Sequence, residues 1–283
     1  MPNSPKVLSF VDVTKPHSNE SNRYRGRLDE SWFQGRGSFG GVLTAFAIRA
    51  FASTVADKRR RVRTLHLHFC APVTTEPFVF DVEPARAGAR VSHLIGRLIQ
   101  DGKTAAIATA TFAAPREDDL YVDDLKAPAA LPLDDAFPIP LGQPGVPVFC
   151  RHFDMRFALG QPPYTQAQEA RLGGHIRLRE PQLVYEEGSD VVKDDAYEDA
   201  LLSAFVDAWP PAAFACASAP RGGASVDLTL TFLHEVHHYE PDAFYIVDVE
   251  SGFVRDGYAQ ETTHLFGPDG RSLVHCRQLV VLL

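Results

Sequence analysis

The sequence predicts an α+β fold in which two copies of one unit each wrap an antiparallel sheet around a helix. Three observations predict it. Four segments recur in the same order in both halves of the chain. Each copy begins with a helix that is apolar all round, which is typical of a buried helix. Three stretches with strand alternation follow each helix, and short turns separate them, which favours antiparallel strands over a parallel βαβ sheet.

The internal repeat is clearest at two Asp-Gly turn signals. "IQDGKTAAIATATF" matches "GPDGRSLVHCRQLV" at an offset of 168 residues. Upstream, "TLHLHF" matches "DLTLTF" at an offset of 163, and "FVFDVE" matches "YIVDVE" at an offset of 167. The helix segment "VLTAFAIRAF" resembles "ALLSAFVDAW" at an offset of 158. Loop insertions of a few residues explain why the offset differs from one segment to the next.

Composition divides the chain between the two units. The first unit is predicted to span residues 1–114 and the second residues 148–283. Residues 115–147 are rich in proline and in acidic pairs, which is the composition of a linker.

The bulk composition limits the possible functions. With 283 residues, 45% of them hydrophobic, and a net charge of −8, the chain can bury a core but is a poor candidate for a general nucleic-acid binder. No apolar run approaches the roughly 18 residues of a membrane span, and the first residues lack the apolar region of a signal peptide. Four dispersed cysteines without a CxxC pair indicate reduced core residues. We expect a cytoplasmic protein with no membrane or nucleic-acid partner.

Two motifs match familiar signatures without the context that those signatures need. "GRGSFG" (residues 35–40) satisfies GxGxxG, but a polar stretch precedes it where a dinucleotide site needs a buried parallel strand. "HEVHH" (residues 234–238) satisfies the zinc-protease pattern HExxH, but the strand pattern before it and Pro241 after it leave little room for a helix. We expect neither a nucleotide site nor a zinc site there.

A basic cluster precedes the first strand after the first helix, and two histidines lie within that strand. "KRRRVR" (residues 58–63) is the one basic cluster of the sequence, and it indicates either a solvated loop or a clamp for a phosphate-bearing ligand. His66 and His68 lie on the polar side of "TLHLHF". We interpret them as surface or site-lining histidines rather than as metal ligands.

Gln278 is a polar residue on an otherwise apolar face of the last strand. A buried amide without partners costs about 1–3 kcal/mol. In the first unit, the repeat places Ala110 at the position that corresponds to Gln278 and Thr64 at the position that corresponds to Asp227. Polar residues in the second copy alone predict one site per chain, built on the second unit. The alternatives are a satisfied core amide for Gln278 and a cap or turn acid for Asp227.

Several segments resemble the type II acyl-CoA thioesterases, a family with a double hotdog fold. "FGGVLTAFAIRAF" is similar to the family's helix, which a Gly-Gly pair opens, and the segment from "TLHLHF" to "ATATF" is similar to its first-unit block. "GGHIRLRE" and "DAWPPA" resemble the thioesterase-like branch, and "SVDLTLTF", "VDVES" and "DGRSLVHCRQ" resemble second-unit blocks. The resemblance extends from about Trp32 to the C-terminus.

The resemblance implies a set of site residues. In that family, activity is attributed to an Asp at the start of the second unit's first long strand, a Thr or Ser after the next strand, and a Gln on the last strand. By position, the Asp is Asp227 and the Gln is Gln278. Gly252 takes the place of the hydroxyl residue, and the adjacent Ser251 could supply the hydroxyl only if the backbone shifted by one residue.

The implied reaction is hydrolysis of an acyl thioester, either acyl-CoA or a carrier-protein thioester, with no metal and no cofactor. Asp227 would act as the general base or orient the water. Gln278 would hold the same water by its carbonyl and Asp227 by its amide. Backbone N–H groups at the helix start, at Gly40 and Gly41, would face the oxyanion, and His66 is a candidate to line the substrate site.

Two other functions remain open. Gly252 favours a catalytically weak hotdog protein that binds an acyl group or another small molecule. A dehydratase-type hotdog enzyme would use a histidine base, for which His66 and His68 are candidates. Resemblance of the fold does not separate these functions. A homo-oligomer is plausible because hotdog units often pair edge to edge, although two units in one chain could satisfy this pairing internally.

Overall fold

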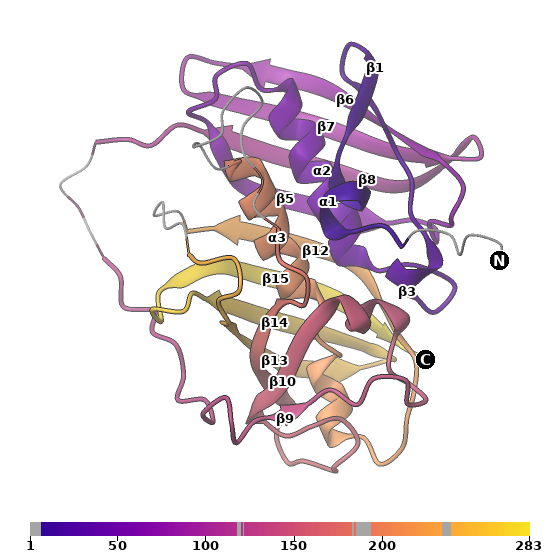
Figure 1. Ribbon diagram of the computed structural model, residues 1–283, viewed down its shortest axis with the longest axis vertical. Coiled ribbons are helices and arrows are strands. Elements are labelled where there is room, and N and C mark those ends of the chain that lie inside the picture. Colours follow the sequence, from indigo (N-terminus) through magenta and orange to yellow (C-terminus); the bar gives the residue numbers. More distant parts are fainter. Residues whose placement is uncertain (1–6, 118–119, 121, 183, 185–193, 234–238) are drawn as a thin grey trace.

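One long antiparallel sheet and two helices packed against its inner face dominate the computed structural model (Figure 1). The structure describes residues 7–117, 120, 122–182, 184, 194–233 and 239–283. Within these residues the sheet has thirteen strands, in the order β1-β2-β6-β7-β8-β5-β12-β15-β14-β13-β11-β10-β9. Every pairing between them is antiparallel, so the predicted α+β class is confirmed.

The first unit contains one long helix and six strands of the large sheet. Residues from Gly41 to Phe51 of this helix are all buried, as its apolar composition predicts. A short β3–β4 hairpin precedes it and contains the start of "GRGSFG". The elements are α1 (Phe10–Thr14), β1 (His17–Glu20), β2 (Arg23–Gly26), η1 (Glu30–Trp32), β3 (Phe33–Gln34), β4 (Gly37–Ser38), α2 (Gly40–Thr54), β5 (Arg61–Phe69), β6 (Phe78–Ala87), β7 (Val91–Gln100) and β8 (Lys103–Ala113).

The second unit repeats this arrangement in reverse order across the sheet. The order inward is β1-β2-β6-β7-β8-β5 in the first unit and β10-β11-β13-β14-β15-β12 in the second, where the short β9 adds an outer edge next to β10. The elements are β9 (Phe137–Pro138), η2 (Val148–His152), β10 (Phe153–Gly160), β11 (Arg171–Leu178), α3 (Asp195–Asp207), η3 (Ala212–Cys216), β12 (Gly223–Phe232), β13 (Tyr245–Arg255), β14 (Tyr258–Phe266) and β15 (Ser272–Leu282).

Four strands follow each helix, where the alternation predicts three. The difference in the first unit arises at the Asp-Gly turn. Asp101 and Gly102 both have positive φ, at 50° and 72°. Two consecutive left-handed residues make the tight reversal of a two-residue hairpin, so residues 91–100 form a strand of their own before β8.

The two units join edge to edge through β5 and β12. His66 pairs with Thr229, and His68 pairs with Asp227. The repeat offset of 163 residues relates His66 to Thr229, so an approximate two-fold axis passes between these two residues. On the inner side of the sheet, α2 and α3 pack against each other (Figure 1). The pairing covers one edge strand of each unit, which would otherwise be open to association.

The predicted linker contributes to the second half of the sheet. β8 ends at Ala113 and η2 begins at Val148, while β9 lies between them and pairs with β10. The motif "HEVHH" lies outside the described residues. No described helix is long and apolar enough to cross a membrane.

All four cysteines are free, but they are not all core residues. Cys150 and Cys276 are buried as predicted, whereas Cys70 and Cys216 are exposed. The prediction was wrong for the exposed pair because Cys70 follows the end of β5 and Cys216 ends η3, so neither lies within a strand that faces the core.

Candidate active site

An amide, a carboxyl and a hydroxyl from three elements meet on the inner side of the second unit. Gln278 on β15 donates from Nε2 to Oδ1 of Asp207, the last residue of α3, over 3.2 Å. The same Nε2 donates to the Ser225 hydroxyl on β12. The pairing partner of Gln278 is Leu228, which is fully buried, so the amide faces the core as its strand pattern predicts. The fold thus satisfies this amide with two polar partners.

A β-bulge in β12 places Ser225 beside Gln278. Ser225 pairs with Val280 and Asp227 pairs with Leu279, so Val226 is an extra residue without a partner of its own. Side chains of a regular strand alternate, and one extra residue moves the following side chains to the opposite face. The bulge therefore turns Ser225 to the inner face and Asp227 to the outer face.

The Asp207 carboxyl lies against the N-terminus of α2. The backbone N–H of Gly41 donates to it. At Gly40, an added Cβ would lie 2.6 Å from Oδ2 of Asp207 and 2.8 Å from the Phe69 ring, so glycine is what allows the end of α3 to approach so closely. Unpaired N–H groups and the dipole give this end of α2 a partial positive charge. The two units therefore build the site together.

Burial raises the pKa of Asp207 to about 7, although the hydrogen bonds from Gln278 and Gly41 lower it. Both protonation states of this carboxyl are therefore accessible at neutral pH. A side chain with a pKa near the working pH is suited to accept a proton and return it. Perturbed carboxyls of this kind occur often at functional sites.

Glu261 is a second buried carboxyl on the inner face. It pairs with Gln278 across β14 and β15, and only 4% of its surface is exposed. Its Oε1 accepts the backbone N–H of Ala212 over 2.6 Å. Burial raises the pKa of Glu261 to about 7, while N–H groups of Ala212 and Ala213 lower it and the charge of Asp207 raises it further. Glu261 thereby anchors η3, the segment that follows α3.

Comparison with known proteins decides the family. Residues 28–113 match the acyl-CoA thioesterase N-terminal domain, and residues 125–282 match the acyl-CoA thioesterase C-terminal domain. The chain belongs to the acyl-CoA thioesterase family. It is a thioester hydrolase, which confirms the class of activity and the family that the sequence motifs indicate. No match is found among curated protein sequences.

Solved structures confirm the double hotdog fold of this thioesterase. A hot dog fold protein of unknown function from Alicyclobacillus acidocaldarius is 21% identical, with a TM-score of 0.80 over 97% of both chains. A putative thioesterase II from Thermobifida fusca is 21% identical, with a TM-score of 0.77 over 99% of both chains. An acyl-CoA thioesterase II from Mycobacterium marinum is 21% identical, with a TM-score of 0.73 over 97% of this chain and 98% of that one.

The thioesterase brings together only part of the site that the sequence predicts. Gln278, Gly40 and Gly41 lie around Asp207. Asp227 faces outward from the same sheet, with Oδ2 3.8 Å from Nδ1 of His68. The structure does not bring it to Gln278, because strand alternation places the two side chains on opposite faces.

Ser251 and His66 also lie apart from Gln278. The Ser251 hydroxyl donates to the backbone carbonyls of Phe253 and Gln260. Its strand, β13, is two strands away from β15, a separation of roughly 9–10 Å. His66 lies on the outer face, where its Nδ1 contacts the Thr229 hydroxyl at 2.6 Å.

Asp207 and Ser225 are site residues that the sequence patterns do not predict. Asp207 is the one acid in "ALLSAFVDAW", a helix otherwise typical of the core, and that position was a usable signal. The corresponding residue of the first helix is Arg49. Ser225 left no comparable signal, because strict alternation places it on the same face as Asp227 and periodicity does not reveal the bulge.

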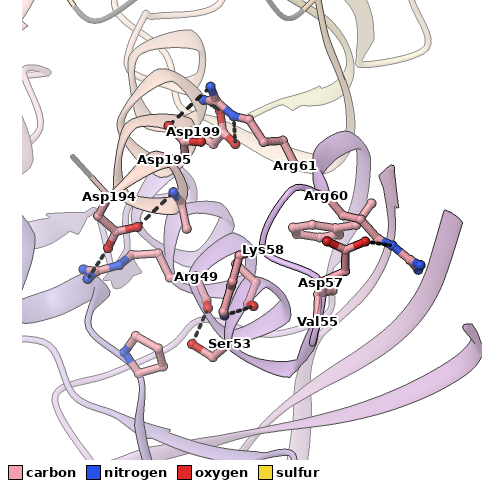
Figure 2. A pocket seen from close by; sticks show the side chains of 14 residues that line it. Arg49, Ser53, Val55, Asp57, Lys58, Arg60, Arg61, Asp194, Asp195 and Asp199 are labelled. Carbon is pink, nitrogen blue, oxygen red and sulfur yellow. Dashed lines mark hydrogen bonds and ion pairs between the residues drawn. The ribbon is translucent and has the colours of Figure 1, made fainter. Parts of the chain in front are cut away.

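A charged pocket of about 420 Å³ lies between the two units, at the end of α2, the start of β5 and the start of α3 (Figure 2). Basic and acidic side chains face each other across it. The ion pairs are Arg49–Asp194 at 3.6 Å, Arg60–Asp57 at 3.4 Å and Arg61–Asp199 at 2.6 Å. Arg61 is the member of the "KRRRVR" cluster that links the units, because it pairs with Asp195 and Asp199 on α3. Arg59 and Arg60 pair with Asp57 of their own unit, so acidic partners compensate much of the cluster's charge.

Proposed function

We propose that this thioesterase hydrolyses acyl-CoA with a water molecule activated by Asp207 and positioned by Gln278 and Ser225. The observation that carries the proposal is the hydrogen-bonded group of these three side chains at the start of α2. We assign the base to Asp207 rather than to Asp227 because Gln278 bonds Asp207, whereas Asp227 faces the other side of the sheet.

The geometry supports a division of roles. Nε2 of Gln278 donates to Asp207 and Ser225, and its Oε1 has no partner among the described residues, so that oxygen is available to accept a proton of the water. The Ser225 hydroxyl accepts from Gln278 and keeps its own proton for donation to the water or to the thioester carbonyl. Asp207, with its pKa raised to about 7, is the base.

The reaction balances with these groups alone. Asp207 takes a proton as the water oxygen bonds to the thioester carbonyl carbon. The resulting oxyanion is stabilised by the positive end of α2, because a preorganised dipole aimed at developing charge lowers the barrier. The C–S bond then breaks, and Asp207 returns the proton to the departing thiolate. The products are the free acid and CoA.

We favour hydrolysis over the alternative of a weak binding protein. That alternative depends on Gly252 standing where a hydroxyl is expected. Gly252 is the extra residue of a bulge in β13, while the hydroxyl beside Gln278 comes from Ser225 on β12. A carrier-protein thioester fits the same chemistry, since the acyl group and the sulfur are the same.

Release of free thiol from a panel of acyl-CoA substrates tests the proposal. We expect Asp207→Asn to lower kcat by at least about 100-fold, since acid–base catalysis contributes about 10²–10⁴-fold. Gln278→Ala should also lower kcat. Gln260→Ala is the matched control, because Gln260 lies on β14 and its side-chain amide bonds only Glu261 and Thr262 among the described residues.

Asp227→Asn separates the two candidate bases. A loss of activity in this variant with retention in Asp207→Asn would overturn the assignment of the base. A folded parent that releases no thiol from any acyl-CoA, but does so from an acyl carrier-protein substrate, would show that the substrate is the carrier protein.

A further inference from the structure

Two histidines and a carboxylate converge on the outer face of the sheet, where the two units join. His66 and His68 occupy alternate positions of β5, and Asp227 on β12 is the pairing partner of His68. The two Nε2 atoms are 2.8 Å apart, and His68 Nδ1 lies 3.8 Å from Asp227 Oδ2. Possible ligand atoms of all three lie within 4.8 Å of one another, and no other such trio occurs among the described residues.

A neighbouring hydroxyl fixes the orientation of His66. Its Nδ1 contacts the Thr229 Oγ1 at 2.6 Å across the β5–β12 pairing. Histidines that bind metals almost always use their second ring nitrogen in a hydrogen bond of this kind, which fixes the tautomer and the ring. A proton on Nδ1 leaves the lone pair of Nε2 directed at Nε2 of His68. In the ion-free site the contact between these two nitrogens is a hydrogen bond with one proton between the rings, and a metal ion bound to both nitrogens would replace that proton.

We propose that His66, His68 and Asp227 bind one divalent transition metal ion of the Zn²⁺, Ni²⁺ or Cu²⁺ class. Imidazole nitrogen suits these ions, and a carboxylate completes a common three-ligand set. Bond lengths of about 2.0–2.2 Å place the ligand atoms of a tetrahedral site about 3.3–3.6 Å apart. The two Nε2 atoms, 2.8 Å apart, therefore need to separate slightly, and the Asp227 carboxylate needs to approach them by about 1 Å. Two of the side chains are half-buried and His68 is exposed, so an ion reaches the site from solvent.

The position of the site gives the ion a structural role. His66 and His68 belong to the first unit and Asp227 to the second, so the ion links the units beside their two-fold axis. Hydrolysis is proposed on the inner face of the same strands, and the ion takes no part in it. A negative result for the metal site would therefore leave the proposed function untouched, and the reverse also holds.

Zn²⁺ titration of the metal-free full chain, with a chromophoric chelator as competitor, tests the proposal. The parent for every measurement carries His234→Ala, His237→Ala and His238→Ala, so that no Zn²⁺ counted in the titration is held by the histidines of "HEVHH". We expect one equivalent of Zn²⁺ to bind. His66→Ala should lose that equivalent, and Asp227→Asn should weaken its binding at least about tenfold.

His275→Ala is the matched control. His275 also lies on the outer face, where it stacks on His264 with ring centroids 4.7 Å apart, but it belongs to no group of three described ligands. Zn²⁺ should raise the Tm of the parent and of His275→Ala, but not that of His66→Ala, because an ion that binds only the folded state stabilises it. A parent that binds no Zn²⁺, or a His66→Ala variant that keeps its equivalent, would overturn the proposal.

Discussion

The replacement Asp207→Asn should stabilise the thioesterase at alkaline pH while it removes the proposed base. The folded chain raises the pKa of Asp207 from 3.8 to about 7, chiefly by burial. The folded protein therefore holds this proton up to about pH 7, whereas the unfolded chain loses it near pH 4. Because the folded state binds more protons in this window, the free energy of unfolding falls as pH rises through it. Asparagine has no proton to lose, so the variant lacks this contribution.

The size of the effect follows from the pKa change. Each pKa unit corresponds to about 1.4 kcal/mol, so complete burial would give about 4 kcal/mol by pH 8. Asp207 retains some solvent exposure, and solvent screening reduces the figure to about 2 kcal/mol. Between pH 5 and pH 8 we therefore expect the stability of the variant to gain about 1–2 kcal/mol relative to the parent.

Urea unfolding at several pH values, followed by tryptophan fluorescence, measures this difference. Trp32 and Trp209 are both buried, one in each unit, so both halves are monitored. Glu261→Gln tests the same reasoning at the second carboxyl, whose pKa burial also raises to about 7, and it should act in the same direction. An Asp207→Asn variant that is less stable than the parent at pH 8, or a difference that does not change with pH, would refute the reasoning.

Three further predictions concern activity and the contact between units. The kcat/KM of the parent should fall below about pH 7 as Asp207 becomes protonated. The Gln278 side chain lowers the pKa of Asp207 by its hydrogen bond, so Gln278→Ala should move the midpoint of this fall to higher pH, and a pH–rate profile of each protein measures the shift. Asp199→Ala should lower the free energy of unfolding by about 3 kcal/mol, since it removes both oxygens that accept from the buried Arg61 guanidinium, and urea unfolding will show it. Gly40→Ala should lower kcat at least about tenfold, because the added methyl group would displace the Asp207 carboxyl from the start of α2, and an unchanged kcat in the thiol-release assay would contradict this.

The sequence predicts the architecture well because the chain contains two copies of the same structural unit. The repeat offset of 163 residues, read from "TLHLHF" and "DLTLTF", agrees with the register in which β5 pairs with β12. The same repeat relates Gln278 to Ala110, and the structure places the two at equivalent positions. Gln278 pairs with Leu228 and Ala110 with Leu65, which are themselves related by that offset.

The partners of Gln278 were harder to predict, for two physical reasons. The bulge in β12 places Ser225 and Asp227 on opposite faces, whereas simple alternation places them on the same face and contains no sign of the bulge. Asp207 reaches Gln278 from a helix, so the contact depends on how α3 lies over the sheet. Sequence periodicity identifies the face on which a residue lies, but it does not predict contacts between elements that come together only in the folded chain.

The first unit shows what the second would be without a site. Across the two-fold axis, Leu94 stands where the second unit has the buried carboxyl of Glu261, and Val62 stands where it has the Ser225 hydroxyl. Apolar residues at such positions stabilise the fold by burial, whereas burying a carboxyl there costs free energy. The same sheet and helix form with either set of residues, so packing does not require the polar set. A polar set that costs stability, and that converges on one helix N-terminus, is what selection for hydrolysis in a single unit would retain.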